Sequence, residues 1–128
     1  HEQGDRALRD TAERIRATLR AGDVVARLGG DEFVALLTNS TLTGSLTAID
    51  RLRDSTPEAE AFSAGVAVWD RREDLSHLLR RSDLALYAAK GQGGSCTAVA
   101  PPQLEPLPAP DEEDDDDELD LGAHARAS

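Results

Sequence analysis

The chain has 128 residues, which is the length of one ordinary domain. Apolar residue types make up 39% and charged types 30%, which excludes collagen, coiled coil and membrane-spanning classes. No apolar run approaches the roughly 18–20 residues that a spanning helix needs. The net charge is −11, and the single cysteine, Cys96, has no partner for an internal disulfide. We therefore expect a cytoplasmic protein that binds no nucleic acid and has no membrane segment in this chain.

The negative charge is concentrated at the C-terminal end. Residues 101–128 carry ten acids and one base, whereas residues 1–100 carry fifteen acids and thirteen bases. Prolines and an unbroken acidic run, residues 111–118, cannot form a packed core because the charges repel one another. We expect a folded body over residues 1–99 and a disordered Pro-rich acidic tail over 100–128. The chain also contains no methionine and opens on His1, so we expect a fragment of a longer protein.

The first half of the body predicts a helix followed by a hairpin. Apolar residues recur at helical spacing over residues 5–20, and Gly22 follows at the position of a helix stop. Two short β-branched runs, residues 24–28 and 33–37, are separated by four residues rich in glycine. This pattern is typical of a β-hairpin whose turn lies at 29–32.

The second half predicts further alternation of helix and strand. Leucines and an isoleucine indicate a helix over 42–52, and residues 61–69 indicate a strand in which Gly65 marks a bulge or a close approach of another backbone. Asp74 is a candidate N-cap for a helix that ends at Gly91, and a short strand over 95–99 is weakly indicated. The order α-β-β-α-β-α-β predicts an α+β fold, a sheet covered on one face by helices.

The hairpin turn combines two residue types that suit a phosphate-bearing ligand. Gly29 and Gly30 allow a ligand to approach the main chain, and Asp31 and Glu32 place hard oxygen ligands beside them. Such oxygens suit Mg²⁺ held next to phosphates. The turn chemistry alone also allows a plain hairpin loop with solvated charges.

The residues of this turn resemble a known family. Gly29-Gly30-Asp31-Glu32-Phe33 reproduces the motif of the GGDEF domain of diguanylate cyclases. Other segments resemble the same family in the same order, over residues 1 to about 97: residues 1–8, 20–23, 25–28, 62–67 and 82–90. The resemblance implies a nucleotidyl-cyclase-like sheet with helices packed on it, shortened at its N-terminus.

The resemblance also implies a reaction. Two GTP condense to cyclic di-GMP with release of pyrophosphate, in a homodimer, with Mg²⁺ or Mn²⁺ as cofactor. By resemblance Asp31 is a metal ligand and a candidate base, Glu32 is a second metal-site carboxylate, and Gly29 and Gly30 lie against the nucleotide. The runner-up interpretation is a degenerate module that binds cyclic di-GMP or GTP without turnover.

Four further residues receive roles from the resemblance. Asp5 matches the family position that accepts hydrogen bonds from guanine, and Lys90 matches the lysine that binds the triphosphate. Without the family, Asp5 could merely cap the first helix and Lys90 could favour the negative end of its helix. Arg20 and Asp23 match the product-inhibition motif, where we expect cyclic di-GMP to bind as a feedback inhibitor.

Two departures from the family bear on activity. The family begins with a strand and helix that carry an Asp-x-Asp-x-Phe-Lys-type stretch, and this chain starts after them. We therefore expect this chain to be inactive and to leave an unpaired strand edge in the sheet. Gly94 stands where the family has an arginine that contacts phosphates, which predicts weakened GTP binding.

Overall fold

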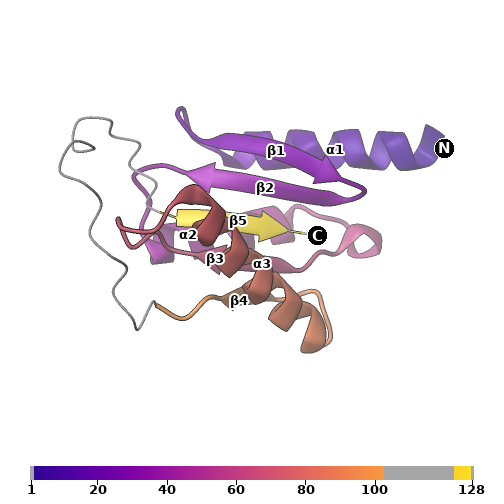
Figure 1. The fold of residues 1–128 in the computed structure, drawn as a ribbon. Helices are drawn as coiled ribbons and strands as arrows, with labels where there is room; N and C mark the ends of the chain where they lie inside the picture. Colours follow the sequence, from indigo (N-terminus) through magenta and orange to yellow (C-terminus); the bar gives the residue numbers. More distant parts are fainter. Residues whose placement is uncertain (1, 103–122, 128) are drawn as a thin grey trace.

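The computed structural model describes residues 2–102 and 123–127, and over them the chain forms three α-helices, a short 3-10 helix η1 (Glu58–Glu60) and a five-stranded sheet (Figure 1). The predicted hairpin is β1 (Val24–Gly29) and β2 (Glu32–Leu37), which pair antiparallel. The predicted later strands are β3 (Ala64–Ala67) and β4 (Thr97–Val99), which pair in parallel through a helical crossover. These elements confirm the α+β prediction.

The helices begin and end close to where the residue patterns place them. They are α1 (Glu2–Thr18), α2 (Leu42–Asp54) and α3 (Leu75–Gly91). Thr41 caps α2 by accepting from the N–H of Gly44, and the predicted cap Asp74 accepts from the N–H of His77. None of the helices in the described part of the chain has the length and apolarity to cross a bilayer.

Helices cover both faces of the sheet, which corrects the expectation of a single covered face. Ala64 and Val66 face α2, where they pack with Ile49. Ala67, the next residue along β3, packs instead with Leu78 and other residues beneath α3. Alternate strand residues point to opposite faces, so an apolar run such as β3 must be covered on both sides.

The fifth strand corrects the prediction for the tail. Ala123–Ala127 forms β5, which lies between β2 and β3 and pairs antiparallel with both, giving the order β1-β2-β5-β3-β4 (Figure 1). The edge that we expected to be unpaired is therefore paired, because residues 123–127 supply main-chain donors and acceptors to both neighbouring strands. The rest of the predicted tail, residues 103–122, lies outside the described residues.

Candidate functional site

The turn of the hairpin is exposed and lies at one end of the molecule. Gly29 and Gly30 both have positive φ, +139° and +53°, which glycine adopts without strain. A side chain built at either glycine would meet no atom within 4 Å. Asp31 is exposed and Glu32 is half-buried. The predicted site is thus open main chain followed by two carboxylates, as the binding of a ligand against the turn requires.

Arg27 braces this turn from the preceding strand. Its Nε donates to the carbonyl of Gly30 at 2.9 Å. The strand pairing is irregular between Arg27 and Gly29, where the chain leaves the regular ladder. The hydrogen bond therefore fixes the position of the two glycines relative to β1. Sequence reasoning missed this role of Arg27, although the residue lies two positions before the motif.

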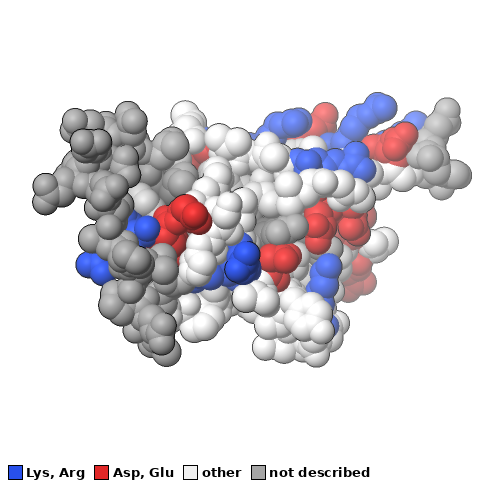
Figure 2. Space-filling view, viewed as in Figure 1, with Lys and Arg blue, Asp and Glu red and all other residues white. Residues whose placement is uncertain are grey.

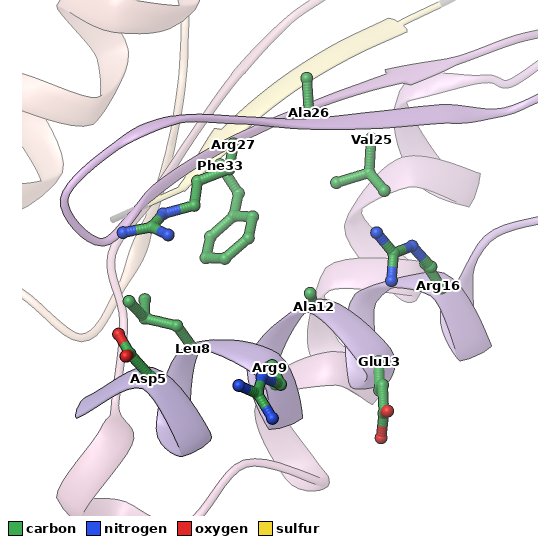
Figure 3. Close-up of a pocket in the computed structure, with 10 residues that line it drawn as sticks. All are labelled: Asp5, Leu8, Arg9, Ala12, Glu13, Arg16, Val25, Ala26, Arg27 and Phe33. Atoms are coloured by element: carbon green, nitrogen blue, oxygen red, sulfur yellow. The ribbon is translucent and has the colours of Figure 1, made fainter. Parts of the chain in front are cut away.

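A cleft of about 480 Å³ lies between α1 and the hairpin, and we call it the α1–hairpin cleft (Figure 3). Asp5 and Leu8 form its wall on α1, and Arg27 and Phe33 reach toward them from the hairpin. Arg27 and Phe33 are register partners, so their side chains arrive at the cleft side by side. The cleft is lined by Asp5, Leu8, Arg9, Ala12, Glu13, Arg16, Val25, Ala26, Arg27 and Phe33.

Asp5 does not cap a helix. Helix α1 begins at Glu2, so Asp5 lies inside its first turns and its exposed carboxylate borders the cleft. The alternative interpretation of Asp5 as an N-cap is therefore wrong. Basic and acidic side chains intermingle over α1 and the adjacent end of the hairpin on the face drawn in Figure 2, so this region has no single sign of charge.

Asp31 lines a second cavity, which adjoins the α1–hairpin cleft. This cavity, of about 240 Å³, is the hairpin-turn cavity; Asp31 lines it together with residues of α1, α2 and the segment 59–62. Leu8 and Phe33 line both cavities, so the cleft bordered by Asp5 adjoins the cavity lined by Asp31. Two predicted site residues that are 26 positions apart in the chain, Asp5 and Asp31, thus border adjoining cavities.

Lys90 lies at the same end of the molecule but lines neither cavity. It is exposed in the last turn of α3, whose C-terminal end and the hairpin turn lie toward the same side in Figure 1. Gly94, which stands where the family has an arginine, has φ +78° and donates its N–H to the carbonyl of Ala89. An arginine would be strained in that backbone conformation, so the local backbone itself explains the glycine.

The carboxylates of the turn fit one kind of metal binding. In residues 2–102 and 123–127 no group of three or more His, Cys, Asp or Glu could hold a metal ion. Mg²⁺ commonly uses only one or two carboxylates together with substrate phosphates and water. Asp31 and Glu32 therefore suit a magnesium ion that arrives with a nucleotide, and they do not suit a dedicated protein cage.

Arg20 and Asp23 form a structured turn rather than two free side chains. Asp23 accepts from the N–H of Arg20 at 2.9 Å and from the N–H of Thr38 at 2.9 Å, so both carboxylate oxygens have partners. The Arg20 guanidinium donates to the carbonyls of Thr38 and Asn39 at 3.1 and 3.4 Å. The motif residues thus also tie the end of α1 to the end of β2.

A cavity of about 370 Å³, the Arg20 cavity, opens beside this turn. Arg20 and Asp23 line it from one side and Arg51 of α2 lines it from the other. Sequence reasoning missed Arg51. The available signal was its spacing on the face of α2 that also carries Gly44, Thr47 and Ala48, all of which line the cavity.

Comparison with known proteins matches the site motifs to one family. The family described as "Diguanylate cyclase, GGDEF domain" matches residues 1–96. Diguanylate cyclase TpbB of Pseudomonas aeruginosa is 36% identical over 104 residues, covering 72% of this chain and 24% of TpbB. Probable diguanylate cyclase DgcC of Escherichia coli is 34% identical, covering 78% of this chain and 30% of DgcC. The chain therefore spans less than a third of the length of these relatives.

Solved structures agree with the fold. The active GGEEF domain of a diguanylate cyclase from Vibrio cholerae superposes with a TM-score of 0.69 at 26% identity, covering 80% of this chain and 72% of that one. The GGDEF domain of TpbB superposes with a TM-score of 0.68 at 33% identity, covering 79% and 66%. On its sequence and its fold, this chain belongs to the GGDEF domain family of diguanylate cyclases.

Proposed function

We propose that this chain is part of a diguanylate cyclase that condenses two GTP into cyclic di-GMP and releases pyrophosphate. The observation that carries the proposal is the exposed Gly29–Glu32 turn, whose Asp31 lines a cavity adjoining the cleft bordered by Asp5. Family membership and the names of the relatives support the same activity. One domain holds one nucleotide, so two copies must face each other to complete the cyclic product.

The roles of the residues follow from their positions. Asp5 would accept hydrogen bonds from guanine at the α1–hairpin cleft, and the open main chain at Gly29 and Gly30 would lie against the phosphates. Asp31 and Glu32 would hold Mg²⁺, which offsets the negative charge of the phosphates when it is bound.

The chemical step would use the same turn. A 3′-hydroxyl oxygen forms a bond to the α-phosphorus of the second GTP, and the bond from that phosphorus to pyrophosphate breaks. The proton of the hydroxyl passes to the carboxylate of Asp31. Lys90, at the same end of the molecule, would attract the triphosphate as a point charge.

Calorimetry of GTP binding tests this assignment. We expect GTP to bind to the full chain in the presence of Mg²⁺, and we expect Asp31→Asn to weaken that binding by tenfold or more. Asp5→Asn should reduce the preference for GTP over ATP. Asp10→Asn serves as the matched control, since Asp10 is exposed on α1 and does not line the cleft. Binding that is equal in all four proteins, or independent of Mg²⁺, would contradict the assignment.

A second candidate function is binding of cyclic di-GMP without turnover. One observation favours it: Arg20 and Arg51 line the Arg20 cavity from its two sides. We propose that cyclic di-GMP binds at this cavity in either case, as a feedback inhibitor or as the sensed ligand. Titrating wild type and Arg20→Ala with cyclic di-GMP tests the site, and equal affinity would refute it.

Turnover distinguishes the two functions. A longer chain, in which the family's Asp-x-Asp-x-Phe-Lys-type strand and helix precede residue 1, is incubated with GTP and Mg²⁺, and the products are separated by anion-exchange chromatography. Cyclic di-GMP formation that Asp31→Asn abolishes supports the cyclase. Retained binding of cyclic di-GMP without product formation supports the module that binds only.

A further inference from the structure

The main chain of the hairpin turn has two possible orientations. Gly30 and Asp31 are its central residues, because Gly29 and Glu32 on either side of them are register partners. Such a two-residue turn is of type I′ when both central residues have positive φ, and of type II′ when only the first has it. The peptide unit between the central residues faces opposite sides in the two types, since the dihedral angles that flank it differ by about 150–170°.

The structure has the second of these orientations. Gly30 has φ +53°, and the non-glycine residues of the described chain that have positive φ all lie outside the turn, so the φ of Asp31 is negative. These are the signs of a type II′ turn. Aspartate also tolerates positive φ, so the pair Gly-Asp is compatible with type I′ as well. The residues of the turn therefore leave the orientation of the central peptide open, and a contact from outside the turn can select it.

Arg27 supplies this contact. Its Nε donates to the carbonyl of Gly30 at 2.9 Å, and this carbonyl belongs to the central peptide. The side chain of Arg27 reaches into the α1–hairpin cleft, so the carbonyl that it binds lies on the α1 side of the hairpin (Figure 3). In a type I′ turn this carbonyl would face the other side and the hydrogen bond would be lost. Arg27 therefore stabilises the type II′ orientation.

The main-chain N–H of Asp31 points away from Arg27 as a result. The described chain contains no cis peptide bond, and in a trans peptide the C=O of one residue and the N–H of the next point in opposite directions. Among the described residues this N–H has no hydrogen-bond acceptor. The turn around it is open, since a Cβ built on Gly30 would meet no atom within 4 Å. The donor is therefore accessible to a ligand.

The side of the hairpin that this N–H faces is the side of Lys90. Helices α1 and α2 line one apolar cavity together, and they cover the same face of the sheet. Helix α3 packs on the opposite face, against Ala67, and Lys90 lies in its last turn at the same end of the molecule as the hairpin turn (Figure 1). A main-chain donor and an ammonium group therefore lie on one side of the hairpin, whereas Asp5 lies on the other side.

We propose that Arg27 is a positioning residue for phosphate binding: it holds the carbonyl of Gly30 on the α1 side and thereby directs the N–H of Asp31 to the triphosphate of GTP. This inference rests on the proposed function, in which Lys90 attracts the triphosphate at the same end of the molecule. Backbone N–H groups attract anions, whereas a type I′ turn would place a carbonyl oxygen there, whose partial negative charge repels phosphates. Arg27 acts through the turn, from the side opposite to the phosphates.

Nuclear magnetic resonance of the ¹⁵N-labelled full chain tests the donor without a substitution. The probe is inorganic triphosphate with Mg²⁺, which lacks guanine and therefore does not occupy the site at Asp5. We expect the amide proton of Asp31 to shift downfield during the titration, because hydrogen bonds to charged acceptors are shorter and stronger than those to neutral ones. An Asp31 amide that stays unchanged at saturating triphosphate, or absence of triphosphate binding in calorimetry, would overturn the proposal.

Arg27→Met tests the positioning role. Methionine has neither the charge nor the donors of arginine, whereas the lysine of Arg27→Lys keeps the charge and can donate to the same carbonyl. We expect Arg27→Met to weaken triphosphate binding about tenfold, as the loss of the bond from Asp31 to a charged acceptor predicts. The three-bond coupling between the amide and α protons of Asp31, which depends on φ, should change as well. Arg27→Lys should recover part of both effects.

Arg6→Met is the matched control. Arg6 is exposed on α1 and lines neither the α1–hairpin cleft nor the hairpin-turn cavity, and its replacement removes the same charge. We expect the triphosphate affinity of this variant and its coupling constant at Asp31 to equal those of wild type. An equal loss of affinity in Arg6→Met and Arg27→Met would mean that net charge, and not the turn, determines binding, which would overturn the proposal.

The ratio of GTP affinity to ATP affinity separates this proposal from the proposed function. Arg27→Met should weaken the binding of both nucleotides equally, because the base is recognised at Asp5. A wild-type chain whose Asp31 amide responds to triphosphate, but which binds GTP and ATP equally, contradicts the proposed function and supports the role of Arg27. A wild-type chain that prefers GTP, with an Asp31 amide that is the same in wild type and in Arg27→Met, supports the proposed function and overturns the role of Arg27.

Discussion

Gly65 is the position at which a single methyl group should do the greatest damage to this fold. A Cβ built on Gly65 would lie 2.2 Å from the backbone nitrogen of Leu86 and 2.3 Å from the carbonyl oxygen of Ser82. Ordinary contacts begin near 3.4 Å, so α3 would have to move away from β3 by about 1 Å. The neighbouring atoms are backbone atoms of a helix, which cannot rotate aside as a side chain can.

The expected cost of Gly65→Ala follows from this geometry. Extra methyl groups in packed cores typically cost about 1–3 kcal/mol, and a clash with two backbone atoms belongs at or above the upper end of that range. Retreat of α3 also loosens the contacts of Leu78 and Leu86, which are 0% and 2% exposed. We therefore expect a loss of about 3 kcal/mol, equivalent to a fall in Tm of roughly 12 °C or more.

Urea denaturation measures this loss. The fluorescence of Trp69, the only tryptophan, reports the region beneath α3, and far-UV circular dichroism reports the helices. Gly4→Ala is the matched control, because a Cβ at Gly4 meets no atom within 4 Å and alanine favours a helix interior. We expect this control to be neutral or slightly stabilising. A Gly65→Ala protein within about 0.5 kcal/mol of wild type would refute the close-approach argument.

Four further predictions concern other parts of the molecule. Arg81→Met should lower the free energy of unfolding, measured by urea denaturation, by about 3–5 kcal/mol, because the fully buried carboxylate of Glu73 loses the guanidinium that lies 2.6 Å away. A decrease of less than about 1 kcal/mol would contradict this. Burial acts to raise the pKa of Asp70, but backbone N–H donors and the Arg81 charge outweigh it and hold the pKa below 3.8. The stability that this lowered pKa provides is fully present above pH 3.8 and is lost as the pH falls through the folded pKa. Asp70→Asn should therefore lose less free energy of unfolding between pH 7 and pH 3 than wild type does. Parallel pH profiles of the two proteins would contradict this prediction. Arg51→Ala should weaken cyclic di-GMP binding by about tenfold or more in calorimetry, as loss of a charge-assisted contact predicts, and an unchanged affinity would remove Arg51 from the site. Ala125→Val in the full chain should raise the midpoint of urea denaturation by filling the cavity beside it, with a gain of up to about 1.6 kcal/mol, and destabilisation would mean that the cavity cannot hold the larger side chain.

The residue sequence alone determined most of the local structure. Glycines followed by two acids predicted the hairpin turn, because Gly29 and Gly30 take the positive φ that such a turn requires. Apolar spacing predicted all three helices, because a helix buries the residues that recur on one face. Gly65 was interpreted as a bulge or a close backbone approach, and the approach of α3 confirms the second of these.

The assembly of the candidate site needed the tertiary structure. Asp5 and Asp31 border adjoining cavities only because α1 packs beside the hairpin, and Arg51 faces Arg20 only because α2 packs beside the end of α1. The hydrogen-bonded partners of Asp23 are Thr38, directly after β2, and Arg20 within its own turn. No local pattern encodes such contacts, because each depends on the packing of elements that are far apart in the chain.

The place of β5 was decided entirely by tertiary structure. Ala123–Ala127 alternates alanine with His124 and Arg126, but it is short and has no β-branched residue, and the acidic run before it predicts no packed structure. It forms a strand because β2 and β3 each present unpaired main-chain donors and acceptors, and a buried edge must be paired. Side-chain patterns determine which segments form helices and strands by themselves. The unpaired backbone groups of β2 and β3 at the centre of the sheet pair instead with a segment of the folded chain that can reach them.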